Sequence, residues 1–142
     1  MDKQFSGMRE RMRTILIVED DQLFRKALTT FLSSLGFETY GVATGEDALR
    51  EVSWSNVDLV LIDYYLPGMN GIDLARTLQA RHLHARMILM SGYLPEAVRQ
   101  EARAAAIELV LCKPHDMASL HKSLEHALVQ EEKVHAHQIP MV

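Results

Sequence analysis

Four short apolar runs in this chain each stop at a polar or ionisable residue. The runs are "TILIV" before Glu19 and Asp20, "LVLI" before Asp63, "MILM" before Ser91 and "LVLC" before Lys113. Runs that are apolar at every position, rather than at alternate ones, are typical of strands buried on both faces of a parallel sheet. Because the C-terminal ends of such strands meet at one edge of the sheet, these polar residues are expected to gather there.

Strand and helix patterns alternate along most of the chain. Strands are predicted at 14–18, 37–42, 58–62, 86–90 and 107–112, and helices at 21–35, 44–52, 71–81, 95–106 and 116–128. Asp21, Thr44 and Asp116 are expected to cap three of the helices. Strict alternation implies parallel strands joined by right-handed crossovers, with helices on both faces of the sheet. The sequence therefore predicts an α/β fold of the doubly wound kind.

Bulk properties limit the classes of protein that fit. The 142 residues suit one domain, since domains commonly run to about 100–150 residues. We expect that domain at 14–130, with an N-terminal extension at 1–13 and a tail at 131–142. The net charge of −4 argues against a nucleic-acid surface, and a single cysteine suits a reducing cytoplasm. No run approaches the ~18 apolar residues of a membrane helix, so a cytoplasmic protein without a membrane part is expected.

The predicted gathering of Glu19, Asp20 and Asp63 has an electrostatic consequence. Two carboxylates ~4 Å apart repel by about 4 kcal/mol at an effective dielectric constant near 20. Either one of them takes up a proton or a cation binds between them. A site made of oxygen ligands favours Mg²⁺ or Mn²⁺ over zinc. With the amine of Lys113 and the hydroxyl of Ser91 nearby, the arrangement suits a carboxylate that accepts a phosphoryl group.

The segments "ILIVEDDQLFRKAL", "LVLIDYYLPGMNGIDL", "MSGY" and "LCKP", in this order and spacing, resemble the receiver domain of two-component response regulators. The resemblance covers about residues 14–130. It implies a flavodoxin-like (βα)5 domain with a five-stranded parallel sheet in the order 2-1-3-4-5. It also implies a signalling domain rather than an enzyme, one that catalyses only its own phosphotransfer and dephosphorylation.

The resemblance assigns a role to each site residue. Asp63 is expected to accept a phosphoryl group from a sensor histidine kinase or a histidine phosphotransferase. Asp63 and Asp20 would bind Mg²⁺ directly, together with the backbone carbonyl of Tyr65, and Glu19 would bind it through water. Ser91 would be the switch hydroxyl, and Lys113 would contact the phosphoryl group. The Lys113–Pro114 bond is a candidate for the cis isomer. The output partner is not evident, and a homodimer is one option.

The chain departs from the family pattern at three positions. Val110 stands three residues before the lysine, where the family commonly has an aromatic switch residue. Ala106 replaces a glycine that usually precedes the fifth strand, and His115 replaces a phenylalanine that commonly follows Lys-Pro. We therefore expect signalling that does not use an aromatic ring at position 110.

Three residues beside the site are predicted to modulate the reaction. Tyr65 and Tyr93 each lie two residues after a site residue, so that their rings could flank the phosphoryl group and hinder an attacking water. Plain surface positions for both rings are the alternative. Gly92, next to the hydroxyl of Ser91, leaves a phosphoryl donor room to approach.

Several other residues suit structural positions. The seven histidines show no zinc-ligand spacing and are expected on the surface. Cys112 is expected to be a buried strand thiol. Leu23 could either be exposed near the site, where it would dock a kinase helix, or pack in the core.

Three other functions fit the sequence less well. A phosphatase of the haloacid dehalogenase type needs a second carboxylate two residues after the nucleophile, where this chain has Tyr65. A phosphorylation-independent pseudo-receiver disagrees with the complete set of acids, hydroxyl and amine. A DNA-binding regulator needs a further helical domain, and the segment after the receiver is too short and not basic enough to provide one.

Overall fold

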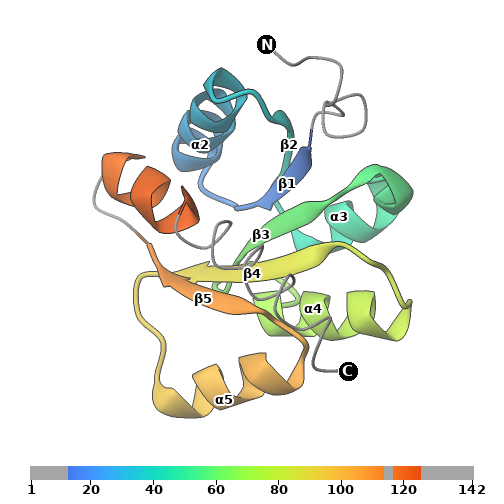
Figure 1. The fold of residues 1–142 in the computed structure, drawn as a ribbon. Coiled ribbons are helices and arrows are strands. Elements are labelled where there is room, and N and C mark those ends of the chain that lie inside the picture. Colours follow the sequence, from blue (N-terminus) through green and yellow to red (C-terminus); the bar gives the residue numbers. More distant parts are fainter. Residues whose placement is uncertain (1–12, 114–116, 126–142) are drawn as a thin grey trace, which may run out of the picture.

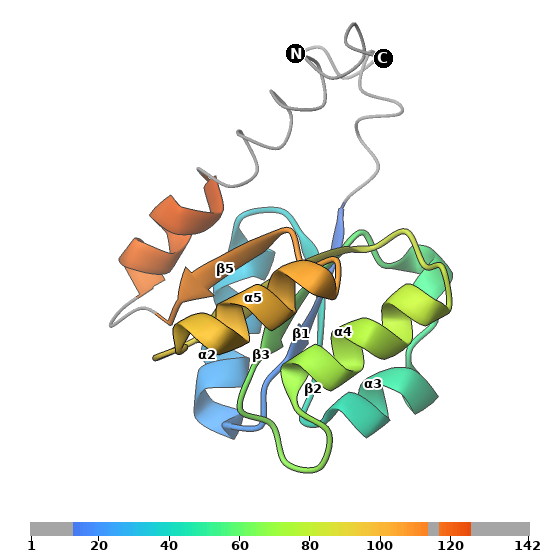
Figure 2. The same ribbon diagram turned by 90° about the horizontal axis from the view of Figure 1, so that it is seen from below.

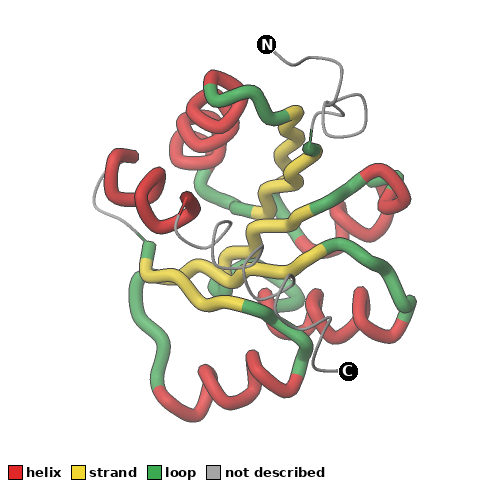
Figure 3. The backbone as a smooth tube through the Cα atoms, in the orientation of Figure 1, coloured by secondary structure: helices red, strands yellow, loops and turns green. Residues whose placement is uncertain are grey.

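The computed structural model describes residues 13–113 and 117–125. Its five strands form one sheet in the order β2-β1-β3-β4-β5, and every neighbouring pair is parallel. The strands are β1 (Thr14–Val18), β2 (Glu38–Val42), β3 (Leu59–Asp63), β4 (Arg86–Ser91) and β5 (Leu109–Cys112). Figure 1 shows the sheet in the middle of the molecule, and Figure 3 shows the strands side by side with helices around them. The predicted fold class and strand order are confirmed.

Helices cover both faces of the sheet, as Figures 1 and 2 show from two directions. One face carries α2 (Gln22–Ser34) and a helix at 117–125, and the other carries α3 (Gly45–Glu51), α4 (Gly71–Ala80) and α5 (Glu96–Ala104). A short 3-10 helix, η1 (Trp54–Asn56), precedes β3. Within the described residues, no helix has the length and apolar character needed to cross a membrane.

The sheet separates two hydrophobic cores, and successive strand residues alternate between them. In β1, Leu16 packs into the core under α3, α4 and α5, whereas Ile15 and Ile17 pack into the core under α2 and the helix at 117–125. Strands β3 and β4 alternate in the same way. Burial on both faces is the reason that these strands are apolar at every position.

Side-chain caps set the starts of three helices. Asp21 accepts hydrogen bonds from the backbone N–H groups of the first turn of α2, and Thr44 does the same for α3, as predicted. Helix α4 begins with a reciprocal capping box formed by Asn70 and Asp73, which the sequence analysis did not identify. Pro95 lies at the N-cap of α5 rather than inside its first turn.

The prediction that Cys112 is a buried thiol is wrong, because its side chain is exposed. Cys112 is the last residue of β5, which is an edge strand and is less buried than the three central strands. Three other predicted features lie outside the described residues, namely the Asp116 cap, the isomer of the Lys113–Pro114 bond and the surroundings of His115.

Ala106 adopts a left-handed backbone conformation, with φ of 66°. It follows the end of α5, where the N–H of Ile107 donates to the carbonyl of Ala102, a contact typical of a helix ending in a left-handed residue. A Cβ atom in this conformation costs about 1 kcal/mol relative to glycine. The departure from the family pattern at this position therefore carries a stability cost.

We expect Ala106→Gly to raise the melting temperature by ~3–5 °C, because it removes that cost. Ala104→Gly is the matched control: Ala104 is exposed in the last turn of α5, where glycine costs about 1 kcal/mol and lowers the melting temperature. Thermal unfolding followed by circular dichroism measures both. A melting temperature that falls in both variants would contradict the strain argument.

Candidate functional site

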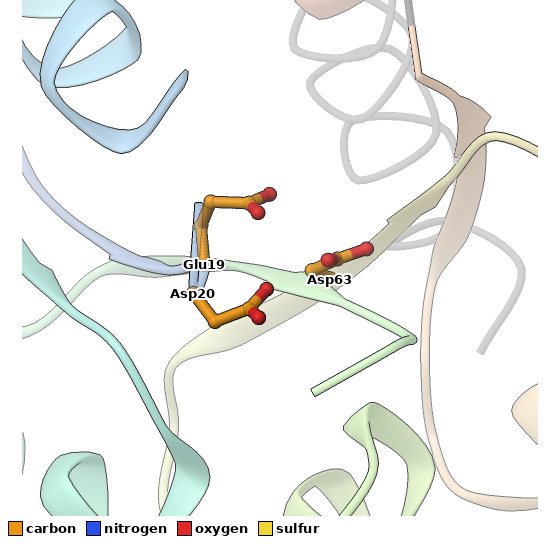
Figure 4. A group of neighbouring side chains, drawn as sticks. All are labelled: Glu19, Asp20 and Asp63. Carbon is orange, nitrogen blue, oxygen red and sulfur yellow. The ribbon is translucent and has the colours of Figure 1, made fainter. Parts of the chain in front are cut away.

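Three carboxylates meet at the carboxyl edge of the sheet. Glu19 and Asp20 follow β1, and Asp63 ends the neighbouring strand β3. One carboxylate oxygen of each residue lies within 4.8 Å of the others. Figure 4 shows the side chains of Glu19 and Asp20 leaving the same strand end beside Asp63. The structure thus brings together the three acids that the sequence predicted to meet.

Lys113, the residue after β5, reaches this acidic cluster across the sheet. Its Nζ lies 2.9 Å from Oε1 of Glu19 and donates a hydrogen bond of 3.5 Å to Oδ2 of Asp63. Its backbone N–H donates to the carbonyl of Ser91 at 2.7 Å, which links Lys113 to the end of β4. Two acids of the cluster therefore share one ammonium group.

Glu19 is the most deeply buried acid of the cluster, with an exposed fraction of 1%. Its Oε2 accepts a hydrogen bond from the backbone N–H of Asp21 at 3.0 Å. Its Oε1 has no hydrogen-bond partner among the described residues, because the neighbouring ammonium of Lys113 makes an ionic contact without hydrogen-bond geometry. A buried oxygen left in this way can accept a bond from a further group, such as a metal-bound water.

The pKa of Asp63, which lies beside Glu19 and Lys113, is raised above its ordinary value. Burial is the largest cause, the charge of Glu19 adds to it, and Lys113 offsets only part, so that the pKa of Asp63 stands at about 6. Burial lowers the pKa of Lys113, but its contacts with Glu19 and Asp63 outweigh burial and raise that pKa. Three carboxylates beside one ammonium leave an excess of negative charge. Oxygen ligands with this excess fit a hard divalent cation such as Mg²⁺.

Ser91 ends β4, the strand beside β3, and its side chain is buried. Its hydroxyl donates to the backbone carbonyl of Tyr93 at 3.3 Å. A Cβ atom on the next residue, Gly92, would meet no atom within 4 Å, so the space that a side chain at position 92 would enter is open.

Tyr65 and Tyr93 are both exposed, with exposed fractions of 57% and 72%. The ring of Tyr65 contacts the ring of Tyr64 edge-on, with 4.7 Å between the centroids. Val110 is half-buried and packs against the core under α3, α4 and α5. The predicted effect of the two tyrosines on phosphoryl lifetime stays a prediction.

Two further side chains hold the loops of the site, and the sequence analysis did not identify them. The guanidinium of Arg25 donates to the backbone carbonyl of Glu19 at 2.7 Å. The carboxylate of Glu46 accepts from the backbone N–H of Met69, in the loop that follows β3, at 3.2 Å. Both residues lie in the first turns of helices, and no spacing in the sequence links them to the loops that they contact.

Comparisons with known proteins agree with this geometry. The family model described as "Response regulator receiver domain" matches residues 15–125. The regulator of RpoS from Escherichia coli is 34% identical over 130 residues, which cover 85% of this chain and 39% of the relative. A cyclic di-GMP phosphodiesterase from Thermotoga maritima is 32% identical over 115 residues, which cover 81% of this chain and 31% of the relative.

A third relative and two solved structures extend the comparison. The cell cycle transcriptional regulator CtrA from Caulobacter vibrioides is 28% identical over 125 residues, which cover 88% of this chain and 54% of the relative. A CheY-like receiver domain protein from Methanospirillum hungatei has a TM-score of 0.73 at 26% identity, covering 86% of this chain and 98% of that one. The response regulator TrrA from Thermotoga maritima, solved with Mg²⁺ and BeF, has a TM-score of 0.70 at 26% identity, and the match covers 81% of this chain and 98% of that one.

The chain therefore belongs to the response regulator receiver domains, the family whose known role is phosphorelay signalling in two-component systems. It spans between 31% and 54% of the length of the three relatives named here. The activity of each longer relative as a whole belongs to that relative and is not assigned to this chain.

Without a divalent cation, we expect Asp63→Asn to stabilise the protein by about 1–3 kcal/mol at pH 8, because folding then no longer buries an ionised carboxylate beside Glu19. The folded pKa of Asp63 is about 6, above the ordinary value of 3.8. The destabilisation is therefore full above pH 6, shrinks between pH 6 and the ordinary pKa, and disappears below that ordinary pKa of 3.8, where the carboxyl is protonated in both states.

Urea unfolding in EDTA at pH 8 and pH 5 tests this expectation. Glu51→Gln, which removes an exposed acid on α3, is the control and is expected to change stability by less than ~0.5 kcal/mol. Equal stability of Asp63→Asn and wild type at pH 8 would show that the cluster carries no such repulsion.

Proposed function

We propose that Asp63 accepts a phosphoryl group from a phosphohistidine on a sensor histidine kinase or histidine phosphotransferase, and that the receiver then presents an altered surface to an output partner. The observation that carries the proposal is the position of Asp63: a buried carboxylate at the end of β3, beside two other acids and 3.5 Å from the ammonium of Lys113. An acid, an amine and a hydroxyl together at one sheet edge suit phosphoryl acceptance, because the amine and the hydroxyl can stabilise the oxygens of the phosphoryl group.

Mg²⁺ is the cofactor that this donor set fits. Asp20, Asp63 and the backbone carbonyl of Tyr65 would hold it, and Glu19 would contact it through water. The excess of negative charge supports this assignment, and so does Oε1 of Glu19, which has an ionic contact with Lys113 but no hydrogen-bond partner among the described residues. The bound ion would offset the charge that the phosphoryl group adds to the cluster.

The residues of the chain have distinct parts in the transfer. An oxygen of Asp63 attacks phosphorus, and the phosphorus–nitrogen bond of the phosphohistidine breaks as the new phosphorus–oxygen bond forms. Lys113 stabilises the negative charge of the phosphoryl oxygens. Ser91 leaves the carbonyl of Tyr93 and donates its hydroxyl to a phosphoryl oxygen, which moves the loop after β4 and so couples the site to the surface.

Val110 constrains how that movement is passed on. A valine that is half-buried against the core cannot swing a ring inward, so we infer that the loop after β4 carries the signal without an aromatic switch at this position. The chain would act as a phosphoacceptor signalling domain in the cytoplasm rather than as an enzyme with turnover, would not itself bind nucleic acid, and has homodimerisation as one option.

A pseudo-receiver that acts without phosphorylation is the second candidate, and the absence of an aromatic residue at 110 is the feature that favours it. The two functions differ in one measurement. We expect incubation with acetyl phosphate and Mg²⁺ to add one phosphoryl group to the wild type, and none to Asp63→Ala, by intact mass.

Asp20→Asn provides the metal arm of that experiment. We expect its phosphorylation to be at least about tenfold slower at the same Mg²⁺ concentration, because one direct ligand loses its charge. Asp73→Asn, which keeps a capping oxygen at α4 outside the acidic cluster, is the charge-matched control. A wild type that gains no phosphoryl group would refute the proposed function in favour of the pseudo-receiver.

The lifetime of the phosphoryl group is a separate prediction. We expect the phosphoryl group on Asp63 to be hydrolysed about two- to tenfold faster in Tyr65→Asn than in the wild type, because a smaller side chain allows water to approach in line. Decay of the phosphorylated protein, after removal of the phosphodonor, measures the rate. Tyr40→Asn changes an exposed tyrosine of β2 and is the control; equal rates for Tyr65→Asn and wild type would remove the argument.

A further inference from the structure

Phe24, in the first turn of α2, lies against the ammonium group of Lys113. The Nζ atom is 4.8 Å from the centroid of the ring. This distance falls within the ~6 Å over which an aromatic face attracts a cation. The ammonium therefore contacts three groups: the carboxylates of Glu19 and Asp63, and the ring of Phe24.

The first turn of α2 is itself anchored to the acidic cluster. The side chain of Asp21 accepts hydrogen bonds from the N–H groups of Leu23 and Phe24, at 3.0 and 3.1 Å. The N–H of Asp21 donates to the carboxylate of Glu19, and the guanidinium of Arg25 donates to the backbone carbonyl of Glu19. Hydrogen bonds through Asp21 and Arg25 thus fix the helix turn that carries the ring relative to Glu19. Glu19 forms the shorter of the two ion pairs with Lys113.

Packing alone is the other explanation for Phe24. The residue belongs to the apolar stripe of α2, and it packs against the core on that face of the sheet together with Phe31. Both phenylalanines are half-buried. Among the described residues, Phe24 contacts the ammonium of Lys113, whereas Phe31 contacts the ring of His121 with 5.4 Å between centroids. Phe31 therefore has the packing role of Phe24 without its contact to the site.

We propose that Phe24 is a positioning residue that holds the ammonium of Lys113 where it meets the incoming phosphoryl group. The ring occupies a side of the ammonium that water would otherwise solvate, and it restricts the rotamers of a long, flexible side chain. An ammonium held in advance needs less reorganisation when charge develops on the phosphoryl oxygens. This inference rests on the proposed function of Asp63 and Lys113.

Three variants separate positioning from packing. Phe24→Leu keeps an apolar side chain and removes the aromatic face, and Phe24→Tyr keeps the face. Phe31→Leu makes the same change as Phe24→Leu about two turns further along α2. Each is phosphorylated with acetyl phosphate at saturating Mg²⁺, and the initial rate is followed by intact mass. We expect a three- to tenfold lower rate for Phe24→Leu, a rate near wild type for Phe24→Tyr, and a rate near wild type for Phe31→Leu.

Phe24→Leu in a Lys113→Ala background tests whether the ring acts through the lysine. We expect Phe24→Leu to have no further effect there, because the cation that it positions is gone. Thermal unfolding of all variants shows that they are folded at the assay temperature.

The results distinguish the role of Phe24 from the proposed function of Asp63. Any of four outcomes would overturn the role of Phe24 while leaving the proposed function intact. Two concern Phe24→Leu alone: a rate equal to wild type, or a full further loss of rate in the Lys113→Ala background. The others are an equal loss in Phe31→Leu and a rate of Phe24→Tyr as low as that of Phe24→Leu. A wild type that takes up no phosphoryl group would overturn both.

Discussion

Burial of both faces of the sheet is the constraint on which the rest of this structure depends. The strands separate two hydrophobic cores, and each strand supplies side chains to both. Such strands have no room for charged side chains along their length, because an unpaired buried charge costs several kcal/mol. The strand ends are where polar side chains can gather. The site at the carboxyl edge, with Glu19, Asp20, Asp63, Ser91 and Lys113, follows from the same packing that makes the strands apolar.

The acidic cluster keeps an electrostatic imbalance that the fold does not remove. One ammonium faces three carboxylates, the pKa of Asp63 is raised to about 6, and one oxygen of Glu19 has no hydrogen-bond partner among the described residues. A sheet edge arranged for stability alone would have paired these groups. This imbalance is the physical basis of the proposed function: a bound cation would offset the excess charge, and a phosphoryl group on Asp63 would change the balance of charge beside the loops of the site.

The elements and the main site residues could be predicted because their signals are local. Asp21 and Thr44 precede apolar periodic segments and cap the helices as expected, and the apolar runs identify four strands whose ends meet. Predictions about exposure were weaker, because they depend on neighbours distant in sequence. Cys112 is in a strand, as expected, yet it is exposed, since β5 lies at the edge of the sheet.

By itself, the sequence determined the fold class, the set of residues at the carboxyl edge and the conflict of charge among them. These follow from periodicity and from which residues end each apolar run. Only the tertiary structure decided which groups pair within that set: the ammonium shared by Glu19 and Asp63, the ring of Phe24 over it, and the bonds from Arg25 and Glu46 to the loops. The reason is that each of these contacts joins separate elements, and its geometry depends on how helices pack on the sheet rather than on any spacing along the chain.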